Sequence, residues 1–335
     1  MAPNGVTGKT RMTKLIGFQS DSRIRKAEFL PWIFAVVIFF VLPEYLSLGA
    51  QILTFILFAL SLDLITGYAG VVTLGHAAFF GVGAYTCGIL SAKLGIMDPI
   101  LLIICSAITC ALLGFSTGLV ILRTQKLTQL MLTLAIAALC YEVANKATLI
   151  TGGADGLTGV TIGPVLGLFK FDFLNKTAYL WCLVILFIFW IIIRRIIYSP
   201  FGITLAGIKE NKQRMQAIGV PVMAYLLKAY TLAAMVAGIA GALITQTNQF
   251  VGLNVIGFEP SGEILVMLIL GGVGRMYGAF IGPFIFLIAQ DYLAKKFPEY
   301  WNLGIGLMLL MVVLYAKGGI LGLIDKLFTK RGEPK

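Results

Sequence analysis

The chain has 335 residues, of which 59% are hydrophobic and only 12% are charged. Soluble domains carry about 25% charged residues, so this composition excludes an ordinary soluble domain and indicates a membrane protein. The formal net charge of +11 would suggest nucleic-acid binding in a soluble protein, but the basic residues lie between apolar stretches, where membrane orientation and anionic lipid account for them.

The first 28 residues form a basic segment ahead of the first apolar stretch. Six Lys/Arg residues lie in it, and it lacks a short early apolar core followed by a cleavage site of small residues. Secretory signal peptides have both features, so the segment does not match one. We expect residues 1–28 to be a cytoplasmic tail that precedes a membrane anchor.

Long apolar stretches fill most of the remaining chain. A membrane-spanning helix needs about 20 mostly apolar residues. The sequence therefore predicts an all-α, polytopic membrane protein of about ten transmembrane helices, with one transmembrane domain over 29–323 and a second cytoplasmic tail over 324–335. The candidate spans are 29–48, 50–66, 76–94, 99–122, 127–149, 178–197, 225–247, 262–274, 276–294 and 301–317.

Basic residues are distributed unevenly between the two sides of these spans. With the N-terminus inside, 20 of the 26 Lys/Arg residues fall on the inner side. Positive charge near span ends resists translocation, so both termini are expected in the cytoplasm. The basic residues left on the outer side are Lys93, Lys146, Lys170, Lys176, Lys295 and Lys296.

Glycine interrupts the helical pattern in two places, GYAGVVTLGHAAFFGVGAY (67–85) and GGVGRMYGAFIGPF (271–284). Broken helices at membrane depth survive only where they are buried or line a cavity, and paired breaks in the two halves of a transporter mark the substrate route. Close helix packing is the alternative, favoured by spacings such as Gly114–Gly118 and Gly278–Gly282. The candidate pathway residues are Gly67, Tyr68, Gly70, Gly75, His76, Phe79, Gly271, Gly272 and Gly274.

His76 is the single histidine and follows Gly75 at an expected helix start. A neutral imidazole there can simply hydrogen-bond a backbone group. An ionisable side chain within a span is also a functional suspect, so His76 could instead face the substrate. Both interpretations stay open.

The outer loop over 150–177 opens with TGGADGLTGV (151–160). Its glycines permit positive φ, and Asp155 can hydrogen-bond its own turn. An ordered turn on the outer face is one interpretation. The other is contact with a protein that delivers the substrate, for which the candidate residues are Gly152, Gly153, Asp155 and Gly156.

The loop 198–224 lies in the longest polar-biased interval of the chain, which carries six Lys/Arg residues, and is expected in the cytoplasm. Within it, Pro200 can start a helix with Ser199 as its cap, and Gly219 can end one. We predict a helix over 200–218. Such an amphipathic helix either lies on the lipid surface or docks into a groove of another protein.

The chain lacks the residue patterns of common catalytic and metal sites. It has no P-loop, metalloprotease motif, nucleophile elbow or paired carboxylates, and its five cysteines lack ligand spacing. We expect no enzyme, no metal and no cofactor bound by this chain. A carrier driven by protons or sodium also needs titratable or oxygen-rich groups at mid-membrane, which are scarce here. A separate cytoplasmic ATPase is therefore the expected energy source.

Four stretches, in this order, resemble the membrane subunits of bacterial ABC importers for branched-chain amino acids, specifically the LivM-type permease family. They span most of the chain from the second predicted helix onward, and the ordered set is specific. They are GYAGVVTLGHAAFFGVGAY (67–85), TGGADGLTGV (151–160), SPFGITLAGIKENKQRMQAIGV (199–220), and the end from GEILVMLILGGVGRMYGAFIGP (262–283) to AKGGILGL (316–323).

The resemblance implies a multi-pass permease of the bacterial inner membrane. Its implied partners are a second related permease subunit, two cytoplasmic ATPase subunits that bind ATP, and a periplasmic substrate-binding protein. The stretch 199–220 is similar to the coupling helix that docks in the ATPase, which makes lipid-surface binding its minor use. The implied coupling residues are Gly202, Leu205, Ile208, Lys209, Glu210, Asn211, Arg214, Ala217 and Gly219.

Some positions depart from the family pattern, including Ile203, Gly207 and Lys212 in the loop. Relatives that import urea or short-chain amides share much of the same pattern, so a permease for these solutes is the first alternative. A stand-alone channel or secondary carrier for a small neutral solute is the second. Flux through this chain alone, without ATP, would favour that second alternative.

Overall fold

The computed structural model describes most of the chain, and the described part is helical as predicted. Within that part, the only β-type pairing is two isolated bridges. The tails 1–28 and 324–335 lie outside the described residues, as does most of the predicted span 301–317. The described residues are 30–124, 126–165, 167, 169, 172, 175–300, 303–307, 310–311 and 318–322.

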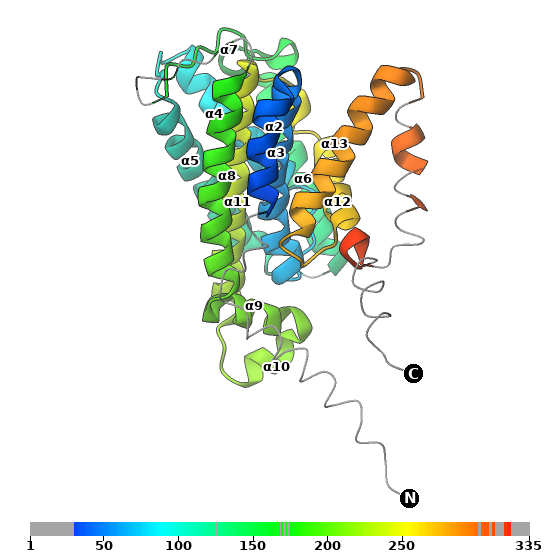
Figure 1. The fold of residues 1–335 in the computed structure, drawn as a ribbon. Coiled ribbons are helices and arrows are strands. Elements are labelled where there is room, and N and C mark those ends of the chain that lie inside the picture. The colour runs from blue at the N-terminus through cyan, green and yellow to red at the C-terminus, as the bar shows by residue number, and fades with distance from the viewer. Residues whose placement is uncertain are drawn as a thin grey trace, which may run out of the picture.

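The long helix α11 (Val222–Asn248) lies at the centre of the bundle (Figure 1) and packs against α3, α4 and α5. Helix α3 (Leu46–Leu62) continues into a π-helical turn, η3 (Asp63–Tyr68). Helix α4 (Ala77–Ala92) and helix α5 (Pro99–Ile121) form an adjacent pair. Residues of α11 are apolar on nearly all sides, which suits a helix that other helices surround.

The remaining helices surround this centre. Helix α8 packs on α3, α2 packs on α8, and α6 packs on α4 and α5. Helices α12 and α13 pair with each other and lean on α3. Their bounds are α2 (Leu30–Val41), α6 (Lys126–Lys146), α8 (Lys176–Ile197), α12 (Phe258–Gly271) and α13 (Gly278–Lys296), with short turns η2 (Pro43–Tyr45), α7 (Thr148–Thr151), η4 (Gly153–Asp155) and η5 (Leu253–Val255).

Five helical segments in the described part are long and apolar enough to cross a membrane. Two more predicted spans fall on the shorter apolar helices α2 and α4, and the eighth and ninth fall on α12 and α13. The structure therefore supports a membrane protein, while the count of ten spans stays a prediction. The five segments are Pro43–Tyr68, Pro99–Ile121, Leu127–Lys146, Lys176–Ile197 and Val222–Asn248.

The two ends of the bundle differ in what covers them. Helices α9 (Pro200–Glu210) and α10 (Lys212–Ala217) project beyond one end, and α7 lies at the other (Figure 1). We call these the α9 end and the α7 end. The basic residues of the interval 194–228 lie in α8, α9, α10 and the start of α11, so they gather around the α9 end.

Glycine allows close approach of the central helices. A Cβ on Gly83 of α4 would meet the backbone of Gly238 in α11, and a Cβ on Gly241 would meet the carbonyl oxygen of Phe80. On α5, Gly114 lies against Ala234 of α11. Small residues that let backbones approach are typical of helix contacts within membranes. The predicted close packing at Gly114–Gly118 is thereby confirmed.

Candidate functional site

The first glycine-rich stretch breaks the helix as predicted, because residues 69–76 are non-helical between η3 and α4. The backbone groups released there find side-chain partners. The Leu74 N–H donates to Thr133 Oγ1 of α6 (3.3 Å), and the Ala77 N–H donates to Ser261 Oγ of α12 (3.0 Å). Interrupted backbone at membrane depth needs such partners, so α6 and α12 hold the start of α4 in place.

The second glycine-rich stretch also breaks a helix, between the end of α12 and the start of α13. The backbones of Gly271 and Gly278 lie in contact across this break, and a Cβ on Gly282 would meet the carbonyl oxygen of Met267. The close packing predicted for Gly278–Gly282 is thus confirmed. At this position the glycines both interrupt the helix and allow the close packing of α12 and α13.

The two breaks meet at the α9 end of the bundle. The Gly274 N–H donates to Asp63 Oδ1 (2.7 Å), across 211 positions of sequence. A Cβ on Gly67 would meet both Asp63 Oδ1 and the Gly274 nitrogen, so only glycine fits between them. Asp63 is 1% exposed, and this buried carboxylate therefore fastens the π-helical end of α3 to the loop that follows α12.

Lys209 of α9 joins the same contact from outside the bundle. Its Nζ donates to the carbonyl oxygen of Gly67 (2.5 Å), and a Cβ on Gly70 would meet its Cγ at 2.8 Å. A Cβ on Gly274 would lie 3.4 Å from the same Nζ. We call Asp63, Gly67, Gly70, Lys209 and Gly274 the glycine junction. One cationic side chain thus connects α9 to both glycine breaks.

The prediction of one continuous helix over 200–218 is wrong, because the helix ends at Glu210 and α10 begins at Lys212. Asn211 has an extended backbone (φ −155°), and its Oδ1 accepts a hydrogen bond from the Arg214 N–H (2.9 Å). Asparagine is a preferred N-cap, and this cap starts a second helix in place of another turn of the first.

The predicted ends of this segment are partly right. Helix α9 begins at Pro200, but Ser199 Oγ donates to the Ile196 carbonyl oxygen (2.6 Å) and does not cap the helix. Gly219 lies just after α10 with φ +86°, a left-handed conformation that glycine adopts readily. The predicted helix end at Gly219 is therefore confirmed, and the predicted Ser199 cap is wrong.

The residues implied for ATPase coupling divide into two groups. Gly202, Leu205 and Ile208 are buried against the chain's own bundle, where α9 contacts α8, α11 and η3. Ile218, which the residue set from the sequence omitted, is 69% exposed beside Gly219. An apolar residue amid the polar residues of this loop was the available signal. The implied residues that are exposed are Lys209, Glu210, Asn211, Arg214, Ala217 and Gly219.

The candidate pathway residues lie mostly inside the packed chain. His76 is 1% exposed, stacks on Phe58 at 5.6 Å between ring centroids, and has Nε2 2.9 Å from Ser61 Oγ. Its partner is thus a side chain and not the backbone group of the first interpretation. Tyr68 and Phe79 are also buried. In this arrangement their contacts are internal, and their role in transport stays a prediction.

The outer-loop residues lie at the α7 end, opposite the glycine junction (Figure 1). Gly152 and Gly156 have positive φ, as predicted, and Leu157 pairs with Val251 through a 2.7 Å hydrogen bond from its N–H. Gly153 and Gly156 are buried, which supports an ordered turn. Asp155 is exposed, and among the described contacts its carboxylate does not make the hydrogen bond to its own turn that the sequence allows.

Comparison with known proteins gives a consistent result. A family model described as "Branched-chain amino acid transport system / permease component" matches residues 44–314. The protein of Salmonella typhimurium named high-affinity branched-chain amino acid transport system permease protein LivM is 24% identical over 313 residues, 86% of this chain and 73% of that relative. The LivM protein of Escherichia coli K12 is 25% identical over 305 residues, 84% of this chain and 71% of that relative.

A second group of relatives is named differently. The protein of Salmonella typhimurium named permease protein LivH of the same high-affinity system is 24% identical over 288 residues, covering 80% of this chain and 91% of that relative. No solved structure was found to match. Because the family model covers well over half of the sequence, the chain belongs to the branched-chain amino acid transport system permease family.

Proposed function

We propose that this chain is a membrane permease subunit of an ATP-driven ABC importer in the bacterial inner membrane. It translocates branched-chain or related small apolar amino acids that a periplasmic binding protein delivers. Family membership supports the transport class, and the names of the LivM and LivH relatives support the substrate class. The observation that carries the mechanism is Lys209, which joins α9 to both glycine breaks.

The α9 end is the cytoplasmic end in this proposal. Its support is the basic interval 194–228 around α9 and α10, because positive charge is retained on the cytoplasmic side. Ten spans with both termini inside fit this orientation. The α7 end then faces the periplasm, and the exposed Asp155 is available to the binding protein there.

Two ATPase subunits supply the energy and bind the ATP, and a second related permease completes the pathway. The existence of relatives with two different names, LivM and LivH, supports such a pair of permeases. The exposed part of α9 and α10 provides the ATPase contact, while Gly202, Leu205 and Ile208 anchor α9 to the bundle. Because one face of α9 is exposed and the other is anchored, a displacement by the ATPase moves α9 as a rigid body.

Force then passes from α9 into the bundle through the glycine junction. Closure of the ATPases displaces α9, and Lys209 carries that displacement to the carbonyl of Gly67 and, through Asp63, to Gly274. The segments after α3 and after α12 therefore move together. Helices that are broken there change tilt at low cost, because glycine breaks remove helical hydrogen bonds that would otherwise resist bending.

Truncating Ile218 to alanine is expected to weaken association with the ATPase about fivefold, because part of an isoleucine side chain that is buried on docking is worth about 1 kcal/mol. The measurement is the amount of ATPase retained by the purified permease across a dilution series. Leu149→Ala is the matched control, since Leu149 is 89% exposed on α7 at the opposite end. Equal weakening by both variants would contradict docking at the α9 end.

The transport class and the substrate are tested by reconstituting this chain with the subunits that co-purify with it. We expect leucine uptake that needs both ATP and the binding protein, and no competition by urea or acetamide. Inhibition by urea would favour the amide importers instead. Solute flux through this chain alone without nucleotide would overturn the whole proposal.

A further inference from the structure

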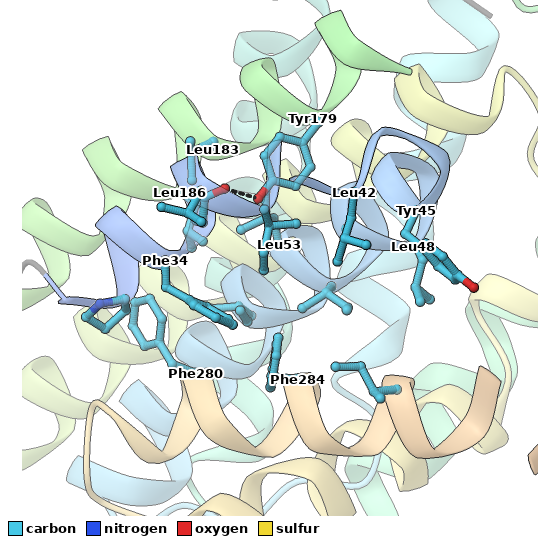
Figure 2. Close-up of a pocket in the computed structure, with 18 of the residues that line it drawn as sticks. Phe34, Leu42, Tyr45, Leu48, Leu53, Tyr179, Leu183, Leu186, Phe280 and Phe284 are labelled. Atoms are coloured by element: carbon cyan, nitrogen blue, oxygen red, sulfur yellow. Dashed lines mark hydrogen bonds between the residues drawn. The ribbon is translucent and has the colours of Figure 1, made fainter. Parts of the chain in front are cut away.

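A large apolar groove lies on the side of the bundle, and none of the glycine junction residues lines it. Its volume is about 740 Å³, within the range of about 300 to 1,000 Å³ that small-molecule sites occupy. Helices α2, α3, α8 and α13 provide its walls (Figure 2). The transport cycle proposed above gives this groove no task.

The outer walls of the groove meet at both ends, where α13 contacts α2 at one end and η2, which follows α2, at the other. Toward one end the ring centroids of Trp32 and Phe280 lie 5.9 Å apart, as do those of Phe34 and Phe284. At the other, Lys295 Nζ lies 4.9 Å from the centre of the Tyr45 ring. Figure 2 shows Phe34 and Phe284 well separated from Tyr45, with leucine side chains between them. The groove is therefore a slot that is closed at both ends and open along its side.

The slot is long enough to take an acyl chain of one bilayer leaflet. The lining residues of α13 run from Phe280 to Lys295, which spans about 22 Å at 1.5 Å per residue. Half of a hydrocarbon core is about 15 Å thick. A helix of a neighbouring protein is about 10 to 12 Å wide and must run past both ends, which the contacts there prevent. A single flexible acyl chain enters from the side and ends inside.

Among the described residues that line the groove, the charged ones are one anion and one cation, both at the Tyr45 end. Lys295 Nζ lies 2.7 Å from Asp291 Oδ2, and the two side chains are 61% and 31% exposed. Exposed ion pairs are worth little, so this pair opens readily to other partners. The pair matches a headgroup that carries a phosphate and a primary ammonium, because Lys295 can bind the first and Asp291 the second.

Aromatic residues at the same end support a position at the membrane interface. Tyr45 and Tyr292 line the groove there and are 46% and 59% exposed. Tyrosine is enriched where the headgroups begin, because its ring is apolar and its hydroxyl is polar. Lys295 is also among the few basic residues on the outer side of the predicted topology, where the positive-inside bias does not account for it.

We infer that this groove holds one phospholipid of the outer leaflet, a phosphatidylethanolamine, with an acyl chain between α2 and α13. The phosphate lies against Lys295 and the ammonium against Asp291. The occupant lies between α13 on one side and α2 and α3 on the other, so it braces α13 against these helices.

The test uses the full-length chain, purified in mild detergent with the subunits that accompany it. After lipid removal it is offered equal amounts of phosphatidylethanolamine, phosphatidylglycerol and phosphatidylcholine, and native mass spectrometry counts the lipids retained per chain. We expect one phosphatidylethanolamine, preferred about fivefold over the other two, the factor that an exposed charged contact can provide.

Two sets of variants separate the acyl chain from the headgroup. Ile288→Trp fills the groove from α13 and should lower retention about tenfold, whereas Ile104→Trp, on α5 outside the groove, should not. The two isoleucines are 41% and 50% exposed, so the changes are matched. Asp291→Asn with Lys295→Gln alters one half-buried and one exposed side chain, and should remove the headgroup preference.

The results that would overturn this inference are distinct for each part. Equal retention by Ile288→Trp, Ile104→Trp and the unmodified chain would mean that the lipid is not in the groove. Equal retention of all three lipids by the unmodified chain would mean that Lys295 and Asp291 do not select the headgroup.

Discussion

Replacing Lys209 with methionine is expected to lower ATP-driven uptake by about 10- to 100-fold, because a hydrogen bond from a charged donor is worth about 1.5 to 3 kcal/mol. Methionine keeps an unbranched side chain against Gly70 but lacks the ammonium group, and with it the charge and the donor to the Gly67 carbonyl. Helix α9 then moves without carrying the glycine breaks with it. The measurement is uptake and ATP hydrolysis by the same reconstituted complex.

The ratio of the uptake rate to the rate of ATP hydrolysis distinguishes a loss of coupling from a loss of folding. We expect Lys209→Met to keep its ATP hydrolysis while uptake falls, with the same amount of chain in the membrane. Lys228→Met is the control, because it removes the same charge at the start of α11, where Lys228 is exposed. Uptake that falls equally in both variants, or only in proportion to the inserted amount, would show that Lys209 does not transmit the movement.

The sequence located both glycine breaks but could not pair them. A high density of glycine at membrane depth indicates an interrupted helix wherever it occurs, and this signal is local. The bond from Gly274 to Asp63 joins positions 211 residues apart, and it depends on how α12 lies against α3. Composition and periodicity do not indicate which residues so far apart in the sequence lie in contact. The glycine junction therefore emerged only from the structure.

The loop 198–224 shows the same limit at the scale of one helix. Leu205 and Ile208 are three positions apart, which indicates an apolar helix face, but the pattern does not say what the face meets. It meets the chain's own bundle, so these residues anchor α9 and leave docking to others. The break at Asn211 could have been predicted from the sequence, because asparagine is a preferred N-cap and therefore favours the start of a new helix at that position.

The close approach of α4 and α11 leads to a second large effect, a loss of stability when a glycine between these helices is replaced with alanine. Replacing Gly241 with alanine is expected to lower the free energy of unfolding by about 1 to 3 kcal/mol, the usual cost of overpacking a core. The added Cβ would meet the Phe80 carbonyl oxygen and the Ala84 nitrogen. Both belong to the backbone of α4, so no side-chain rotation relieves the clash and the two helices must separate.

Gly262→Ala is the matched control, because it makes the same change inside α12, where a Cβ would meet nothing within 4 Å. Alanine favours helix over glycine by about 0.5 to 1 kcal/mol, so this variant should be slightly more stable than the unmodified chain. Unfolding in mixed micelles of increasing SDS content measures both variants on one scale. The opposite signs make the comparison sharp: a stable Gly241→Ala variant would mean that α4 and α11 have room to move apart. Because α4 begins directly after the first glycine break, that freedom would also loosen the glycine junction's hold on the bundle.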